Sequence, residues 1–260
     1  MATPRVLILR APGTNCDEET EFAFEQAGAR ADRVHVNRLL AAPRAAADYQ
    51  ILCIPGGFSY GDDIAAGRIL ANQLRHHLYE ALSEFKEAGK LILGICNGFQ
   101  VLIKSGMLLP EDDQGLPPAT LSWNDSGRFE DRWVRLRVVN DRCIFLQGIA
   151  ALELPVAHAE GKFVVRDDQS LEQLQRQSQV ALQYTSRSGD GQPAAYPDNP
   201  NGSMRAIAGI CDTTGRVLGL MPHPERNIDP THHPQWTRRP NQGPGDGAAL
   251  FANAVAFFRL

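Results

Sequence analysis

The chain has 260 residues, of which 43% are hydrophobic and 22% charged, and its formal net charge is −4. This composition excludes wholesale disorder, and the lack of clustered basic residues argues against a nucleic-acid partner. The longest apolar runs are about half a dozen residues, far short of the roughly 20 that cross a membrane. No secretory leader precedes the first apolar run, so we expect a cytoplasmic protein.

The first hundred residues alternate between short strands and helices. Four runs are predicted as strands: residues 5–10, 31–36, 51–54 and 90–94, and all but 31–36 contain an unbroken apolar stretch. Three segments are predicted as helices: residues 17–26, 64–88 and 99–104. Apolar strands separated by helices indicate a parallel sheet that is covered on both faces. We therefore predict a doubly wound, mostly parallel α/β fold with flanking helices.

The pattern changes after about residue 105. Residues 133–139 alternate between apolar and charged side chains, which indicates a half-buried antiparallel strand. Residues 205–211 and 216–221 are two further strands joined by a hairpin-like turn, and residues 246–259 form a closing helix. Three segments rich in polar residues, Pro and Gly are predicted loops: residues 106–125, 185–202 and 228–247. No linker or repeat is evident, so we expect residues 1–260 to be a single domain with an added antiparallel portion.

One of the five cysteines follows a buried strand at a sharp turn. Residues 90–94 run into Gly94, Cys96 and Gly98, and a helix follows. This is the form of a nucleophile elbow with Cys in place of Ser, in which the flanking glycines relieve crowding. The helix N-terminus favours a thiolate, and the backbone N–H of Asn97 would face a developing oxyanion. The other four cysteines have no C-x-x-C spacing, and we predict no metal site.

A cysteine nucleophile needs a base, and His223 is the best candidate. The strand at residues 216–221 delivers His223 to its carboxyl end, and Glu225 is near enough to orient the imidazole. A structural role is the alternative for any single histidine. The remaining histidines weighed for this role lie at predicted surface, loop or packing positions: His35, His76, His77, His232 and His233.

A glycine-rich loop follows the strand at residues 51–54. Gly56 and Gly57 would let backbone N–H groups approach a ligand closely, and Gly57 is the candidate for a second oxyanion donor. A tight turn without a ligand is the alternative.

Five motifs in order resemble the class I (triad) glutamine amidotransferases, and within them the glutaminase subunits of phosphoribosylformylglycinamidine synthase. The motifs are PGTNCD at residues 12–17, GGFSYGD at 56–62, GICNGFQ at 94–100, PVAHAEG at 155–161 and MPHPER at 221–226. The resemblance covers nearly the whole chain and implies a flavodoxin-like sheet. Residues 62–67, 188–199 and 228–245 depart from the family pattern, which bears on the partner interface.

The resemblance implies a role for each matching residue. Cys96 attacks the side-chain amide of L-glutamine to give a glutamyl thioester and ammonia, with His223 as base and then acid, oriented by Glu225. The residues expected to bind the oxyanion or the substrate are Gly57, Phe58, Asn97, Gln100, His158 and Glu160. No role follows for Cys16, although it lies in a motif.

The resemblance also implies partners. Ammonia would pass to a synthetase subunit (PurL), with a small PurS subunit also expected, for the conversion of formylglycinamide ribonucleotide to the amidine in purine biosynthesis. The chain has no G-x-x-x-x-G-K-[ST] loop, so no cofactor is expected on it, and ATP and Mg are expected on the synthetase. Two alternatives are a stand-alone Cys–His hydrolase or peptidase of similar fold and a non-catalytic regulatory subunit.

Overall fold

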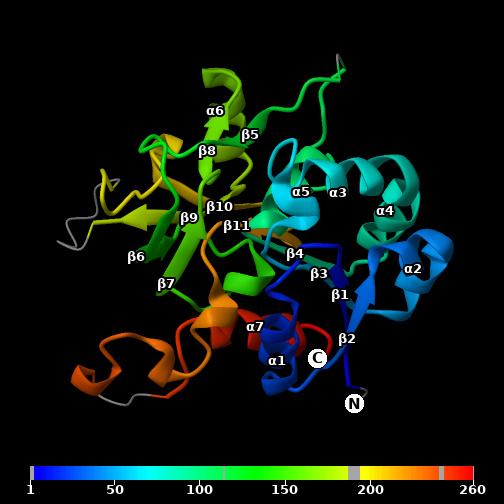
Figure 1. Cartoon of the computed structure of the whole chain (residues 1–260), viewed down its shortest axis with the longest axis horizontal. Helices are drawn as coiled ribbons and strands as arrows, with labels where there is room; N and C mark the ends of the chain where they lie inside the picture. The colour runs from blue at the N-terminus through cyan, green and yellow to red at the C-terminus, as the bar shows by residue number, and fades with distance from the viewer. Residues whose placement is uncertain (1–2, 114, 187–193, 240–242, 260) are drawn as a thin grey trace.

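The structure, a computed structural model, describes residues 3–113, 115–186, 194–239 and 243–259. Within these ranges, nine strands form one central sheet (Figure 1). Their order is β2 (Arg30–His35), β1 (Arg5–Arg10), β3 (Ile51–Ile54), β4 (Leu91–Ile95), β11 (Val217–Leu220), β10 (Ile207–Cys211), β9 (Val180–Thr185), β6 (Glu130–Val138) and β7 (Ala151–His158). Strands β5 (Ala119–Ser122) and β8 (Lys162–Val165) form a separate antiparallel pair.

The central sheet has a parallel half and an antiparallel half. From β2 to β11 all neighbouring strands are parallel, and from β11 to β7 all are antiparallel. Strands β3, β4 and β11 are buried at every residue, as expected for parallel strands covered on both faces. The predicted fold class, a mostly parallel first half with an antiparallel addition, is confirmed.

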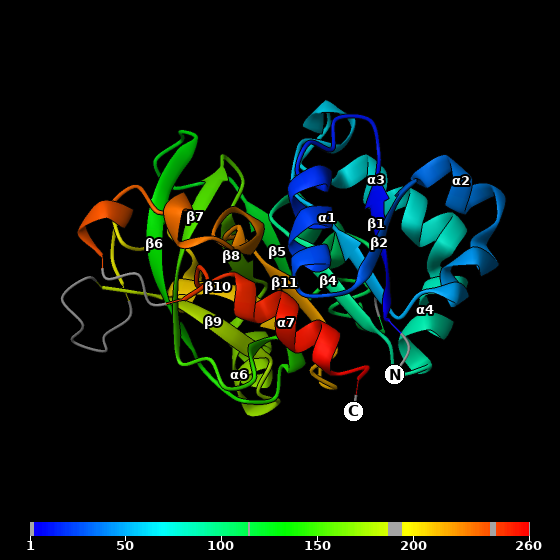
Figure 2. The same ribbon diagram turned by 90° about the horizontal axis from the view of Figure 1, so that it is seen from below.

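Helices cover both faces of the parallel half (Figures 1 and 2). Helices α1 (Asp17–Gln26) and α7 (Ala248–Ala256) pack together on one face, and α3 (Arg68–Gln73), α4 (Tyr79–Glu87) and α5 (Asn97–Lys104) lie on the other. Helix α2 (Val36–Ala41) follows β2, and α6 (Asp168–Arg176) follows β8. None of the helices in the described ranges is both long and apolar enough to cross a membrane.

Several element boundaries differ from the sequence prediction. The helix predicted over residues 64–88 begins only at Arg68, because Gly67 has a left-handed φ of +71° that breaks the turn, and a π-helical turn, Leu74–Leu78, separates α3 from α4. The loop predicted over residues 106–125 contains β5. The loops predicted over residues 185–202 and 228–247 lie partly outside the described residues.

Register brings the two predicted catalytic segments to one edge of the sheet. Strands β4 and β11 are parallel neighbours with Gly94 opposite Gly219 and Ile95 opposite Leu220. Both strands therefore end side by side at the carboxyl edge, which is where α/β sheets bind ligands. Cys96 follows Ile95 directly, and His223 follows Leu220 by three residues.

Candidate active site

Cys96 occupies a strained turn between β4 and α5. Its φ of +50° and ψ of −106° lie outside the regions that non-glycine residues normally adopt, as in a nucleophile elbow. A Cβ on Gly98 would stand 1.8 Å from the carbonyl oxygen of Ile54, and one on Gly94 would stand 2.7 Å from the carbonyl oxygen of Gly98. Both flanking glycines are therefore required for this close approach of strand and helix.

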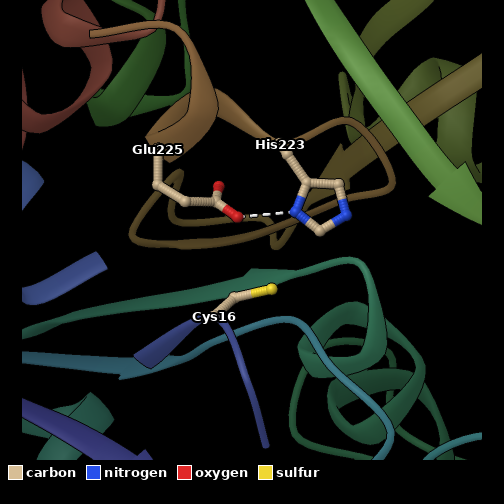
Figure 3. A group of neighbouring side chains, drawn as sticks. All are labelled: Cys16, His223 and Glu225. Atoms are coloured by element: carbon tan, nitrogen blue, oxygen red, sulfur yellow. Dashed lines mark hydrogen bonds and ion pairs between the residues drawn. The ribbon is translucent and has the colours of Figure 1, made fainter. Parts of the chain in front are cut away.

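His223 and Glu225 form a buried pair (Figure 3), and His223 lies close enough to the Cys96 thiol to interact with it. The ring Nδ1 of His223 lies 2.5 Å from Oε1 of Glu225, and both side chains are almost fully buried. Burial alone lowers the pKa of His223, but the Glu225 carboxylate and the neighbouring Cys96 and Cys16 thiols raise it well above its usual value. The other ring nitrogen, Nε2, has no hydrogen-bond partner among the described residues and is free to serve a thiol.

Strand β7 contacts both candidate catalytic residues through its backbone. The N–H of His223 donates to the carbonyl oxygen of Pro155 at 2.9 Å, and the Sγ of Cys96 lies 3.7 Å from the carbonyl oxygen of Ala157. β7 is four places from β11 in the sheet order, so the antiparallel half must curl back over the carboxyl edge. In the sequence these residues stand out only as the PVAHAEG motif, and the strand is not among the predicted elements.

The two candidate oxyanion donors both have backbone N–H groups without a hydrogen-bond partner among the described residues. Asn97 is the first residue of α5, where no intrahelical acceptor exists. Gly57 bridges Thr14 in an antiparallel pair, and the adjacent N–H of Phe58 donates to Gly13 at 3.0 Å. In such a non-hydrogen-bonded pair the N–H of Gly57 points away from Thr14. The N–H of Phe58 is thus occupied, and its exposed side chain lies at the surface.

Gly57 also needs to be glycine. Its φ is +133°, and a Cβ would stand 2.7 Å from the backbone nitrogen of Asn15. The segment at residues 12–16 therefore runs against the loop after β3 too closely for any side chain. Cys16, in the same segment, donates its N–H to the carbonyl oxygen of Gly56 at 3.3 Å.

Gln100 and Glu160 contact one another. The amide nitrogen of Gln100 donates to the carbonyl oxygen of Glu160 at 2.5 Å, and its amide oxygen accepts from Asn97 at 2.9 Å. The Glu160 carboxylate accepts from the N–H of Ala66 at 3.3 Å and lies 3.9 Å from Lys104 Nζ. The structure thus brings these residues together as links between loops, and their predicted contact with glutamine stays a prediction.

His158 is a buried neutral histidine behind the site. Its Nδ1 lies 3.1 Å from Oδ1 of Asn124, and its Nε2 has no partner among the described residues. Burial, followed by the charge of His223, lowers the pKa of His158 to about 3. At neutral pH the ring is therefore uncharged, and it adds no positive charge beside His223.

Cys16 is a second thiol next to His223 (Figure 3), and the sequence assigned it no chemistry. The ligand atoms of Cys16, His223 and Glu225 lie within 4.8 Å of one another, a spacing that a thiophilic metal ion can bridge. Arg226, however, donates to Cys16 Sγ at 3.1 Å and to Glu19 at 3.1 Å. A guanidinium on the thiol opposes a dication electrostatically, so the arrangement favours a hydrogen-bonded network.

The predicted loop at residues 228–245 lines a different region. A cavity of about 710 Å³ there is bordered by His233, Trp236 and Arg239, and no predicted catalytic residue borders it. His233 is buried with its ring 4.4 Å from that of Trp133, and its Nε2 lies 3.5 Å from Glu153. His35 instead accepts from the N–H of Asn37 at the start of α2.

Comparisons with known proteins agree with this geometry. Residues 3–258 match the CobB/CobQ-like glutamine amidotransferase domain family. The subunit PurQ of phosphoribosylformylglycinamidine synthase from Dehalococcoides mccartyi is 48% identical over 260 residues, covering 100% of this chain and 99% of the relative. The corresponding subunit from Methanococcus maripaludis is 41% identical over 266 residues, covering 98% and 97%.

A solved structure is also similar over its full length. The structure of PurLQS from Thermotoga maritima contains a chain with a TM-score of 0.74 and 30% identity, with 100% of both chains covered. These similarities extend over the triad segments and over both halves of the sheet. The chain therefore belongs to the PurQ family of glutamine amidotransferases, the glutaminase subunits of phosphoribosylformylglycinamidine synthase.

Proposed function

We propose that the chain hydrolyses L-glutamine to glutamate and ammonia through a thioester on Cys96, as the glutaminase subunit of phosphoribosylformylglycinamidine synthase. The observation that carries this proposal is the placement of a strained cysteine elbow beside a buried His223–Glu225 pair with a separation of 2.5 Å. Family membership supports the reaction, and this geometry supports the assignment of roles to individual residues.

Each proposed step uses a group in or beside the Cys96 turn. His223 takes the thiol proton at Nε2, and the sulfur of Cys96 attacks the amide carbon of glutamine. The negative charge on the resulting tetrahedral oxygen is stabilised by the N–H groups of Gly57 and Asn97. His223 then protonates the leaving nitrogen, and the C–N bond of the tetrahedral intermediate breaks, which releases ammonia and leaves the glutamyl thioester on Cys96. Water, deprotonated by the same imidazole, releases glutamate and restores the thiol.

Glu225 holds His223 in the orientation that this sequence of proton transfers needs. Its Oε1 accepts from Nδ1, which leaves Nε2 as the ring nitrogen available to the thiol. The carboxylate also stabilises the imidazolium that forms after proton transfer. The raised pKa of His223 reflects this stabilisation.

The ammonia is passed to a synthetase subunit (PurL), with PurS as a further partner, for the ATP-dependent conversion of formylglycinamide ribonucleotide to the amidine. We place ATP and Mg on the synthetase, since this chain has no phosphate-binding loop sequence. We also place the complex in the cytoplasm.

Phe58 and Phe129 support a protein contact beside the site, because their ring centroids lie 6.4 Å apart in a stacked arrangement while both side chains are exposed. We treat residues 1–260 as one domain.

The proposal is tested by Cys96→Ala in the reconstituted complex with the synthetase. Glutamine-dependent synthesis should vanish, while synthesis from added ammonia should survive because that reaction bypasses the thioester. Cys53→Ala is the matched control: Cys53 is fully buried on the neighbouring strand β3, and burial raises the pKa of its thiol well above the usual value. If Cys96→Ala retained full glutamine-dependent turnover, the assignment of the nucleophile would be wrong.

The same variants separate an amidotransferase from a stand-alone hydrolase. A chloroketone analogue of glutamine should label Cys96 stoichiometrically in the wild-type chain and in Cys53→Ala, and should leave Cys96→Ala unlabelled. Hydrolysis of peptides without any response to this reagent would favour the hydrolase instead.

A further inference from the structure

The side chain of Asn97 links the nucleophile turn to the loop that carries Gly57. Its amide oxygen accepts from the N–H of Ser59 at 3.2 Å, and its amide nitrogen donates to Asp62 Oδ1 at 3.0 Å and to Gln100 at 2.9 Å. Asn97 is 3% exposed. Every hydrogen-bonding position of this buried amide nitrogen, and one of the two on its oxygen, is thus occupied by protein.

Asp62 closes the loop at its other end. Its Oδ1 also accepts from the N–H of Gly67 at 3.1 Å, and its backbone has a left-handed φ of +53°. That conformation is uncommon for a residue other than glycine and needs support from the surroundings. One carboxylate oxygen therefore joins the two ends of the turn at residues 62–67 and joins that turn to the first residue of α5.

These contacts couple the two oxyanion donors. Asn97 offers its backbone N–H as one donor. Its side chain forms hydrogen bonds with Ser59 and Asp62, which lie two and five residues beyond Gly57 in the same loop. Oxyanion donors act only when they are held about 3 Å from the position that the charged oxygen will occupy. The spacing between the donors consequently depends on the Asn97–Asp62 bond.

We propose that Asp62 is a positioning residue for glutamine hydrolysis, which fixes the Gly57 loop against the Cys96 turn through the Asn97 side chain and so sets the oxyanion site. This inference rests on the proposed function and extends it to a residue that touches neither substrate nor thiol. Cys96 itself is held separately, because its N–H donates to the Leu220 carbonyl at 2.8 Å. Loss of the Asp62 contact should therefore spoil acylation without displacing the nucleophile.

The test compares two reactions of the same thiol in the full chain bound to the synthetase. Glutamine hydrolysis builds charge on a carbonyl oxygen. Alkylation by iodoacetamide forms a carbon–sulfur bond at a methylene carbon and expels iodide, so it needs no oxyanion donors. The site of alkylation is established by mass spectrometry of the peptide that contains Cys96.

Asp62→Ala should lower kcat for glutamine by about 10- to 100-fold, the scale for misplacing a catalytic group or losing one oxyanion donor. The rate of Cys96 alkylation should stay within about twofold, since Asn97 and not the thiol loses its anchor. Asp62→Asn should restore most of kcat, because its amide oxygen can accept both hydrogen bonds. Asp63→Ala, a change at the adjacent exposed residue, should behave as wild type.

Three results would overturn the inference. Unchanged kcat in Asp62→Ala would show that the loop holds its position without the carboxylate. An equal loss of hydrolysis and alkylation would show a general structural role. A loss in Asp62→Asn as large as in Asp62→Ala would show that charge, and not the acceptor, matters. Failure of the proposed function is distinct, because it appears as persisting glutamine-dependent activity in Cys96→Ala whatever the Asp62 variants do.

Discussion

Replacing Gly98 by alanine puts a methyl group into the contact between α5 and the end of β3. The added Cβ would stand 1.8 Å from the Ile54 carbonyl oxygen, whereas real Cβ atoms essentially never approach closer than 3.0 Å. Helix and strand end must then separate by about 1.2 Å, and a backbone carbonyl at the end of a buried strand cannot rotate away as a side chain would. Overpacking of this kind costs about 1–3 kcal/mol of stability.

The same displacement reaches the chemistry. Asn97 precedes Gly98 and Gly57 follows Ile54 by three residues, so the shift pulls the two proposed oxyanion donors apart. A misplacement of about 1 Å can reduce turnover by about 100-fold, and we expect a loss of that order in kcat for Gly98→Ala. The assay is glutamate formation by the full chain with its synthetase, together with urea unfolding.

Gly106→Ala provides the matched control at the opposite end of α5. A Cβ there meets nothing within 4 Å, although φ is +77°, so only backbone strain of about 1 kcal/mol is added. Its stability should fall while turnover stays near that of wild type. If Gly98→Ala kept turnover within about threefold of wild type, the tight contact would not set the geometry of the site and the reasoning would be refuted.

Two further predictions concern buried titratable groups. Glu225→Gln should lower kcat by about 10³- to 10⁴-fold, because it removes the charge that orients and stabilises the protonated His223; steady-state kinetics test this, and a loss below tenfold would contradict it. His158→Phe should flatten the dependence of unfolding free energy on pH. In the unfolded chain His158 gains a proton below about pH 6.5, whereas in the folded chain it does so only at about pH 3. The free energy of unfolding of the wild type therefore falls as the pH drops through that window, by about 2 kcal/mol between pH 7 and pH 5. The raised pKa of His223 affects the pH dependence of stability in the opposite direction, but it does so in both proteins and cancels when they are compared. If urea unfolding gave the same slope of free energy against pH for the wild type and His158→Phe, the buried neutral state of His158 would be disproved.

The parallel half and the convergence of Cys96 and His223 on one edge of the sheet could be predicted because their signals are local. The glycines on both sides of Cys96 reflect the close approach of α5 to the strand ends that the structure shows directly. His223 follows a short apolar strand, β11, that pairs in register with β4. Parallel strands that are buried on both faces leave an unbroken apolar run in the sequence.

The antiparallel half was harder, and β7 shows why. It alternates in the manner of a strand, but Pro155 lies within it, and proline argues against a central strand. β7 lies at the edge of the sheet, where a missing N–H is tolerated. The carbonyl groups of β7 contact His223 and Cys96 only because the whole sheet curls. No local sequence pattern predicts that curl. The role of Asp62 likewise depends on a contact with Asn97 that only the folded loops create.

The position of β11 has a consequence for the order in which activity is acquired. β11 is inserted between β4 and β10, although it is the last strand among the described residues. A ribosome-bound chain that ends between Cys96 and His223 lacks the proposed base. Until the antiparallel half has folded, it also lacks the contacts that the β7 carbonyl groups make with His223 and Cys96. Contacts between such distant segments form late and slowly. The candidate nucleophile and its base therefore meet only after β11 has paired with β4, late in the synthesis and folding of the chain.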